Sequence, residues 1–185
     1  ITPIQYYLLT SMGIDEKIAL TVTFATGLAV IGVTMINSTR KHKANGFIVK
    51  QHLKSMIVLS FLGAILGAIL AQHIDVSILR LIFGVVCILS TLVLVIIKAP
   101  EDLTNIKTNA ILFNSVAFFA GLISGLIGPA GGALAIPIFI AYLNYPITHT
   151  IGTNSALSIA ISLAGVLTYI LLGWGVPGLP DFSLG

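Results

Sequence analysis

Five glycines and two prolines interrupt an otherwise apolar stretch at 121–137, which reads GLISGLIGPAGGALAIP. Pro129 lacks an amide hydrogen and predicts the end of a helix, while Gly131 and Gly132 allow another molecule to approach the backbone closely. The short helix expected from Ala133 onward would point its free N–H groups into this break. Because a helix N-terminus preceded by glycines can hold an anion, the pattern indicates a site for a small oxyanion.

A second group of hydrogen-bond donors follows at 152–155, which reads Gly-Thr-Asn-Ser. We expect it at the start of the next span, Thr153 to Leu172, with its hydroxyl and amide groups near the first break, and we expect two prolines, Pro3 and Pro137, to set the breaks. The other reading is close helix packing through glycine, with no ligand. The candidate solute-binding residues are Gly128, Gly131, Gly132, Pro137, Gly152, Thr153, Asn154, Ser155 and Thr26.

Charged side chains are absent from the whole segment between Thr108 and Pro180, and His149 is its only histidine. Proton coupling would therefore lack the usual carboxylate relay, so we expect the solute to carry its own proton or to follow its gradient and the membrane potential. The sequence contains no recognisable set of nucleophile, base or metal ligands. We therefore expect no enzymatic activity, no cofactor and no metal site.

The composition predicts an integral membrane protein, because 57% of the 185 residues are hydrophobic and only 8% are charged. A soluble domain has about 25% charged residues. The formal net charge of +3 does not indicate a nucleic-acid partner, because five of the nine Lys and Arg side chains lie at 40–54, between two apolar spans. The positive-inside rule makes 39–54 a cytoplasmic loop, so the partner surface is the bilayer.

The predicted elements are membrane helices separated by short polar segments. Each long apolar run is sufficient to cross a hydrocarbon core of about 30 Å, whereas Ala133 to Leu143 is too short and predicts a half-helix. Ile1 to Leu9 resembles the tail of a span that begins upstream, so we expect the sequence to be a fragment. The expected spans are Ile18–Ser38, Ser55–Gln72, Val76–Ile97, Thr108–Gly128 and Thr153–Leu172.

The two parts of the chain resemble each other weakly. Pro3 corresponds to Pro137 and Thr26 to Thr153, and counting crossings from the basic loop gives the matching spans opposite directions. An inverted repeat of this kind is typical of secondary transporters. The expected fold is all-α: a polytopic membrane helical bundle with broken helices and an inverted-topology internal repeat. Its predicted divisions are residues 1–99 and 108–185, joined by a linker at 100–107.

Two long motifs also resemble a known family. GLISGLIGPAGGALAIPIF, followed by IGTNSALSIAISLAGVLTYILLGW, is similar to the TauE/SafE sulfite-exporter family of permeases. In the first half, ATGLAVIGVTMINSTRKHKANG resembles the corresponding family span, with Thr26, Ser38, His42 and Gly46 in register. The chain departs from the family pattern at three positions, which are Gly27, Ala130 and Asn154.

This resemblance implies a permease that moves small sulfur-containing or organic oxyanions, such as sulfite or sulfoacetate, across the cell membrane by alternating access. The expected partners are a small anionic solute and the lipid bilayer, with no nucleic acid. Two alternatives remain open at this point: an anion channel on the same scaffold, and a structural membrane subunit that transports nothing. The sequence alone leaves the substrate, the direction of transport and the oligomeric state open.

Overall fold

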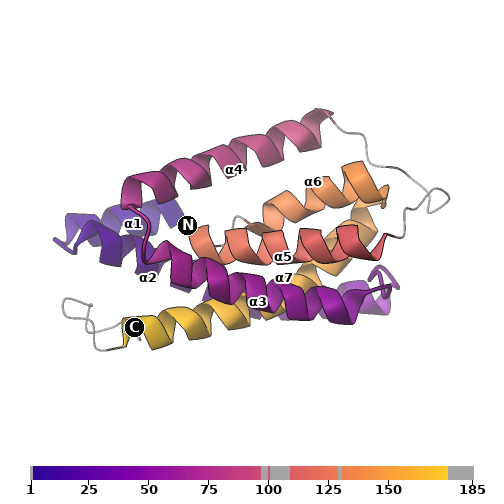
Figure 1. Ribbon diagram of the computed structural model, residues 1–185, viewed down its shortest axis with the longest axis horizontal. Coiled ribbons are helices and arrows are strands. Elements are labelled where there is room, and N and C mark those ends of the chain that lie inside the picture. The colour runs from indigo at the N-terminus through magenta and orange to yellow at the C-terminus, as the bar shows by residue number, and fades with distance from the viewer. Residues whose placement is uncertain (1, 97–99, 101–108, 129–130, 175–185) are drawn as a thin grey trace.

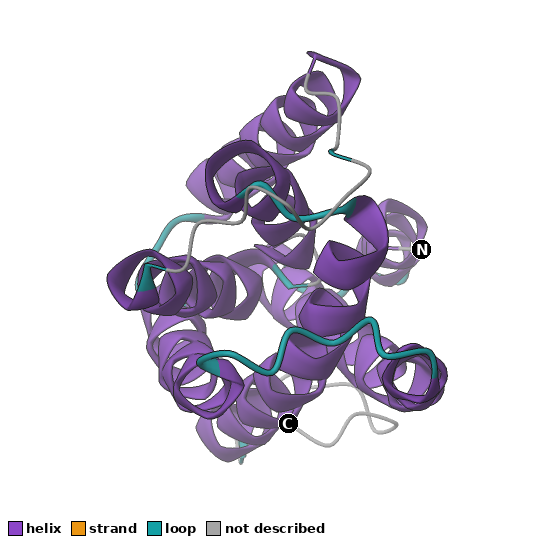
Figure 2. Ribbon diagram, turned by 90° about the vertical axis from the view of Figure 1, so that its right-hand side faces the viewer, coloured by secondary structure: helices purple, strands orange, loops and turns teal. Residues whose placement is uncertain are grey.

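The described part of the chain is a helical bundle (Figure 1). The computed structural model describes residues 2–96, 100, 109–128 and 131–174. Within these residues there are seven helices and no strand, and Figure 2 shows most of the helices nearly end-on. Five of them, α2, α3, α4, α5 and α7, are long and apolar enough to cross a membrane. The helices are α1 (Thr2–Ser11), α2 (Glu16–Ala44), α3 (Leu53–Ala71), α4 (Val76–Ile96), α5 (Ala110–Ile127), α6 (Gly131–Leu143) and α7 (Ile147–Gly173).

Side-chain caps explain where two of the spans begin. The carboxylate of Asp15 accepts a hydrogen bond from Lys17 N at 2.9 Å and starts α2, and the carboxamide of Asn109 accepts one from Ile111 N at 3.0 Å and starts α5. Such caps satisfy amide groups that have no partner within the helix. The fold class predicted from the sequence is confirmed, and the predicted linker at 100–107 lies outside the described residues except for Pro100.

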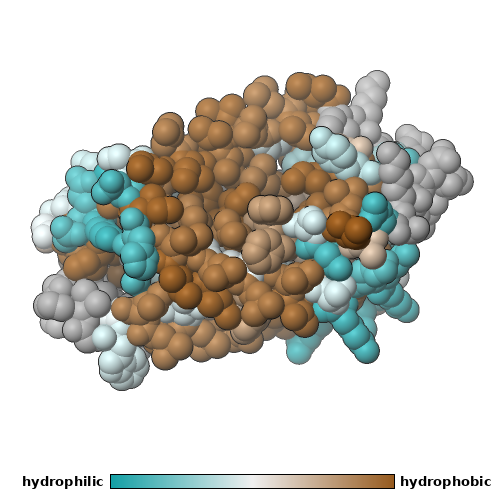
Figure 3. Space-filling view, in the orientation of Figure 1, coloured by the Kyte–Doolittle hydropathy of each residue, from teal (hydrophilic) through white to brown (hydrophobic). Residues whose placement is uncertain are grey.

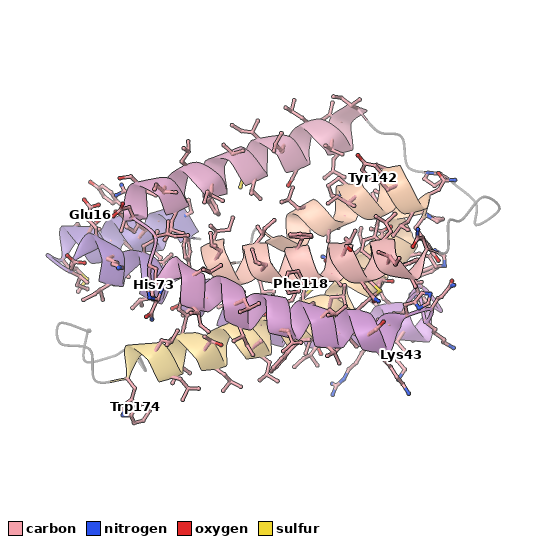
Figure 4. The ribbon with its side chains drawn as sticks, in the orientation of Figure 1. Glu16, Lys43, His73, Phe118, Tyr142 and Trp174 are labelled. Atoms are coloured by element: carbon pink, nitrogen blue, oxygen red, sulfur yellow. The ribbon has the colours of Figure 1, made fainter. Side chains whose placement is uncertain are left out.

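The basic segment is shorter as a loop than we expected. α2 continues to Ala44, and α3 begins at Leu53, so only residues 45–52 lie between the two helices. The helix continues because nothing breaks it before Asn45 and Gly46, and Gly46 takes the positive φ of 74° that ends it. Figure 4 shows Lys43 at this end of the bundle, here called the basic end.

The opposite end carries a separate polar cluster. Figure 4 places Glu16, His73 and Trp174 there, and the space-filling view in Figure 3 shows a broad hydrophobic belt between two hydrophilic ends. Arg80 forms an ion pair with Glu16, and its guanidinium carbon lies 5.3 Å from the centre of the Tyr6 ring. The long Arg80 side chain thus carries its charge to the polar end of the bundle.

Helices α3 and α5 form the closest seam in the bundle and lie side by side in Figure 1. A Cβ atom built on Gly67 would lie 2.0 Å from the carbonyl oxygen of Leu122, and one built on Gly121 would lie 2.1 Å from that of Ser60. Only glycine permits such an approach of two backbones. The small residues on the facing sides of these two spans therefore serve helix packing.

Helices α2 and α7 pack in opposite directions. Ser38 contacts Ser155 near the basic end, whereas Leu28, further along α2 toward the opposite end, packs on Gly165. The predicted correspondence of Thr26 with Thr153 also pairs Ser38 with Gly165 and Leu28 with Ser155. The correspondence therefore maps the contact between Ser38 and Ser155 onto the contact between Gly165 and Leu28. A two-fold axis between the two helices would relate the contacts in the same way.

Candidate functional site

The break between α5 and α6 lies within the bundle. α5 ends at Ile127, and Gly128 follows with φ 78° and ψ −139°, a conformation open essentially to glycine alone. In Figure 1, α2, α4 and α7 all extend further toward the end that carries Glu16 than the end of α5 does. Pro129 and Ala130 lie outside the described residues.

The predicted half-helix is confirmed. α6 has 13 residues, which span about 20 Å and cannot cross a hydrocarbon core of about 30 Å. It runs back along α5, because the ring centroids of Phe139 and Phe113 lie 5.8 Å apart. Its N-terminus at Gly131 leaves amide groups without helical acceptors, and Figure 1 shows α6 starting partway along the length of the bundle rather than at either end.

Pro137 does not set a break, contrary to the sequence-based prediction. It is buried inside α6, which continues on both sides of it from Gly131 to Leu143. Proline is tolerated within membrane helices where surrounding groups or local adjustments satisfy the freed backbone carbonyl. The break is instead set three residues before α6, at Gly128, which packs directly against α2: a Cβ there would lie 3.1 Å from Cδ1 of Phe24.

The Gly-Thr-Asn-Ser group does not lie at a helix start, so this part of the prediction is wrong. α7 begins at Ile147, after Pro146, and Gly152 to Ser155 fall in its second and third turns. Proline fixes its own φ and has no amide hydrogen to satisfy, so it suits the entry to a helix. The backbone amides of these four residues are therefore not free donors for a solute.

Two hydroxyls of this group already have protein partners. Thr153 Oγ1 donates to the His149 carbonyl at 2.8 Å and accepts a hydrogen bond from the amide of Val49 at 2.9 Å. Ser155 Oγ donates to the Ile151 carbonyl and lies 3.0 Å from Ser38 Oγ. These side chains tie α7 to the basic loop and to the end of α2.

Gly152 has a packing role at the same place. A Cβ on it would lie 2.5 Å from the carbonyl oxygen of Phe47, so glycine is needed for the basic loop to rest on α7. The ring centroid of Phe47 also lies 5.4 Å from that of His149, which places this histidine at the basic end of the bundle. Just before α7, burial raises the pKa of the Tyr145 phenol above its ordinary value, because a buried site disfavours the charged form.

Asn154 is the member of the group that remains available. Its side chain is only 8% exposed, and its Oδ1 has no hydrogen-bond partner among the described residues. Thr150, one turn earlier on the same face of α7, is fully buried, and its Oγ1 is likewise unpaired within the described part of the chain. Buried polar atoms are nearly always satisfied, so these two side chains are candidates for contact with a solute or water. Among the described residues, the buried side-chain atoms Thr39 Oγ1, His42 Nδ1 and Ser162 Oγ also lack a hydrogen-bond partner.

The structure separates some of the predicted site residues. Along α7, Asn154 lies about 16 Å closer to the basic end than Gly165 does. Gly165 packs on Leu28 of α2, and Gly128 packs on Phe24, which is one turn from Leu28 in the same helix. Gly128 and Asn154 are therefore at different depths in the bundle. The candidate site is consequently a path along α6 rather than a single point.

Thr26 is not brought to the break. Phe24 faces Gly128, and residues two positions apart in a helix point in different directions. Thr26 is exposed, and its hydroxyl donates to the Val22 carbonyl of its own helix at 2.7 Å. A role for Thr26 in solute binding stays a prediction.

Sequence reasoning missed one residue at the break. The phenolic hydroxyl of Tyr169 in α7 donates to the backbone carbonyl of Gly125, in the last turn of α5, at 2.6 Å. Tyr169 stands in a long apolar run, and nothing in its spacing singles it out. Its only sequence signal is the rule that a buried tyrosine needs a hydrogen-bond partner.

Five helices long and apolar enough to cross a membrane, together with the shorter α6 that starts partway along the bundle, describe a multi-pass membrane protein. The family model described as sulfite exporter TauE/SafE matches residues 1–182. The chain therefore belongs to the TauE/SafE sulfite exporter family, as its motifs predicted.

Two relatives, each described as a probable membrane transporter protein, are similar to this chain. The one from Haemophilus influenzae is 27% identical over 193 residues, which cover 100% of this chain and 70% of the relative. The one from Methanocaldococcus jannaschii is 23% identical over 171 residues, which cover 92% of this chain and 63% of the relative. No solved structure matches.

Proposed function

We propose that this protein moves a small sulfur-containing or organic oxyanion, such as sulfite or sulfoacetate, across the cell membrane by alternating access. The observation that carries the proposal is the break between α5 and α6, where a helix N-terminus begins within the apolar bundle. A helix N-terminus offers amide hydrogens and the positive end of its dipole, which suit an anion without requiring a charged side chain.

In this proposal the solute contacts the backbone at Gly131 and Gly132 and then the carboxamide of Asn154. The unpaired, buried Oδ1 of Asn154 supports a bound group that donates a hydrogen bond, and the carboxamide nitrogen can donate in return. A singly protonated oxyanion offers both kinds of contact, in agreement with a solute that brings its own proton. Thr153 and Ser155 support the site by holding α7 in place.

Alternating access requires two arrangements of the halves around one path. The opposed packing of α2 on α7 supports the inverted repeat that such motion uses. The division into residues 1–99 and 108–185 is part of this proposal.

The test is solute flux into proteoliposomes that contain the protein expressed from its complete coding sequence. Sulfite, thiosulfate, sulfoacetate and simple carboxylates are supplied one at a time over a range of concentrations. We expect saturable uptake of at least one sulfur oxyanion. Conductance that rises without saturation would instead indicate a channel, and uptake of none of these solutes would contradict the oxyanion proposal.

A further inference from the structure

The hydrogen bond between Tyr169 and Gly125 joins α7 to the last turn of α5. The side chain of Tyr169 is 1% exposed, and its hydroxyl lies 2.6 Å from the Gly125 carbonyl oxygen. Gly125 is three residues before Gly128, where α5 gives way to the break. The contact therefore acts directly on the end of the broken helix.

The carbonyl of Gly125 needs a donor from outside its own helix. In a continuous α-helix it would accept a hydrogen bond from the amide four residues later, which here is Pro129. Proline has no amide hydrogen, and a buried carbonyl without a partner is costly in an apolar medium. The Tyr169 hydroxyl supplies the hydrogen that Pro129 cannot.

Gly125 is also fixed from the other side. A Cβ on it would lie 2.1 Å from the carbonyl oxygen of Ala64, so α3 presses directly on its backbone. α3 and α7 thus hold Gly125 from two directions, through a close backbone contact and through a hydrogen bond. Of these two restraints, only the hydrogen bond can be removed without changing the packing volume.

We infer that Tyr169 is a positioning residue for the break: its hydroxyl holds the last turn of α5 and thereby the path at Gly128 and the start of α6. This inference rests on the proposed function for its effect on transport. Its effect on the end of α5 is independent of any solute. The two parts can therefore be tested separately.

The first test is hydrogen–deuterium exchange of the protein in nanodiscs. Tyr169→Phe removes only the hydroxyl, so we expect amide exchange in the segment 122–128 to be about fivefold faster than in the wild type. Tyr142→Phe is the matched control, because Tyr142 is 62% exposed on α6. Unchanged exchange at 122–128 in Tyr169→Phe would overturn the inference.

The second test is uptake by the same variants in proteoliposomes. A loosened site binds solute more weakly, so Tyr169→Phe should raise the half-saturation concentration for uptake about tenfold. Tyr142→Phe should keep the wild-type half-saturation concentration. Simple loss of folded protein would lower only the maximal rate. Faster exchange with an unchanged half-saturation concentration would overturn the positioning role. Absence of uptake by the wild type would contradict the proposed function. The exchange measurement would still show whether the Tyr169 hydroxyl holds the end of α5.

Discussion

The side-chain hydroxyls of Ser38 and Ser155 lie 3.0 Å apart and connect the last turns of α2 to the third turn of α7. Each hydroxyl is close to the basic end, and the contact sets the register in which the two helices run past each other. About three turns further along, Leu28 meets Gly165 in the same register. The relationship is what an inverted repeat requires, since each contact is the image of the other.

The register can be tested by cross-linking. Ser38→Cys combined with Ser155→Cys, in a Cys87→Ser background, should form a disulfide in membranes under mild oxidation, because the native side-chain oxygens are already in contact. Asn37→Cys with Ser155→Cys is the control, since Asn37 is exposed and points elsewhere. Equal cross-linking of both pairs, seen as equal shifts on non-reducing gels, would contradict this register.

The seam between α3 and α5 predicts a strong effect of a single methyl group. Gly67→Ala would place a Cβ 2.0 Å from a backbone oxygen of α5, so the helices must separate, and we expect a loss of about 1–3 kcal/mol of stability. Gly84→Ala in α4 meets nothing within 4 Å and should be neutral or stabilising. Thermal unfolding in detergent compares the two variants. A similar melting temperature for both would contradict the close backbone contact between α3 and α5 at Gly67.

Gly128 should be intolerant of substitution for two reasons. Alanine there would adopt an unfavourable positive φ of 78° and meet Phe24 at 3.1 Å, so we expect about 1–3 kcal/mol of destabilisation and loss of uptake. Gly13→Ala, with φ 83° and open space around it, measures the backbone effect alone. Unfolding and flux measurements in which both variants behave alike would show that the contact with Phe24 is unimportant.

Two conservative replacements of Thr153 should differ in their effect on stability. Thr153→Val preserves shape but leaves the buried amide of Val49 without its acceptor, which we expect to destabilise the protein by about 1–3 kcal/mol. Thr153→Ser keeps the hydroxyl and should retain most of the stability. Melting temperatures in detergent make the comparison, and equal losses for both variants would assign the role of Thr153 to packing.

Much of the fold could be predicted because hydropathy and helix breakers are local signals. Most of the predicted span ends lie within about two residues of the observed ones, and the half-helix follows from Gly131 and Gly132 and its short apolar run. One larger error concerns the end of α2, which lies at Ala44 rather than Ser38, and the other concerns the start of α7, which lies at Ile147 rather than Thr153. Pro146 was the signal that could have corrected it, because proline commonly marks the entry to a helix.

The contacts that shape the candidate site could not be predicted in the same way. Periodicity shows that one face of α7 is buried, but it does not name the partner of Tyr169 or Ser155 on another helix. It also could not show that Gly128 and Asn154 lie at different depths, because depth depends on how the helices cross. These are tertiary relationships, and they arise from packing rather than from local propensity.

Uptake by Asn154→Asp is the sharpest test of oxyanion binding at the Asn154 carboxamide. This nearly isosteric change puts a carboxylate at the position where we propose that the oxyanion binds. Asn37→Asp makes the same change at an exposed position. For a transported sulfur oxyanion in proteoliposomes, we predict that Asn154→Asp abolishes saturable uptake while Asn37→Asp retains it, with both proteins folded by thermal unfolding. Wild-type uptake kinetics in folded Asn154→Asp would contradict the account.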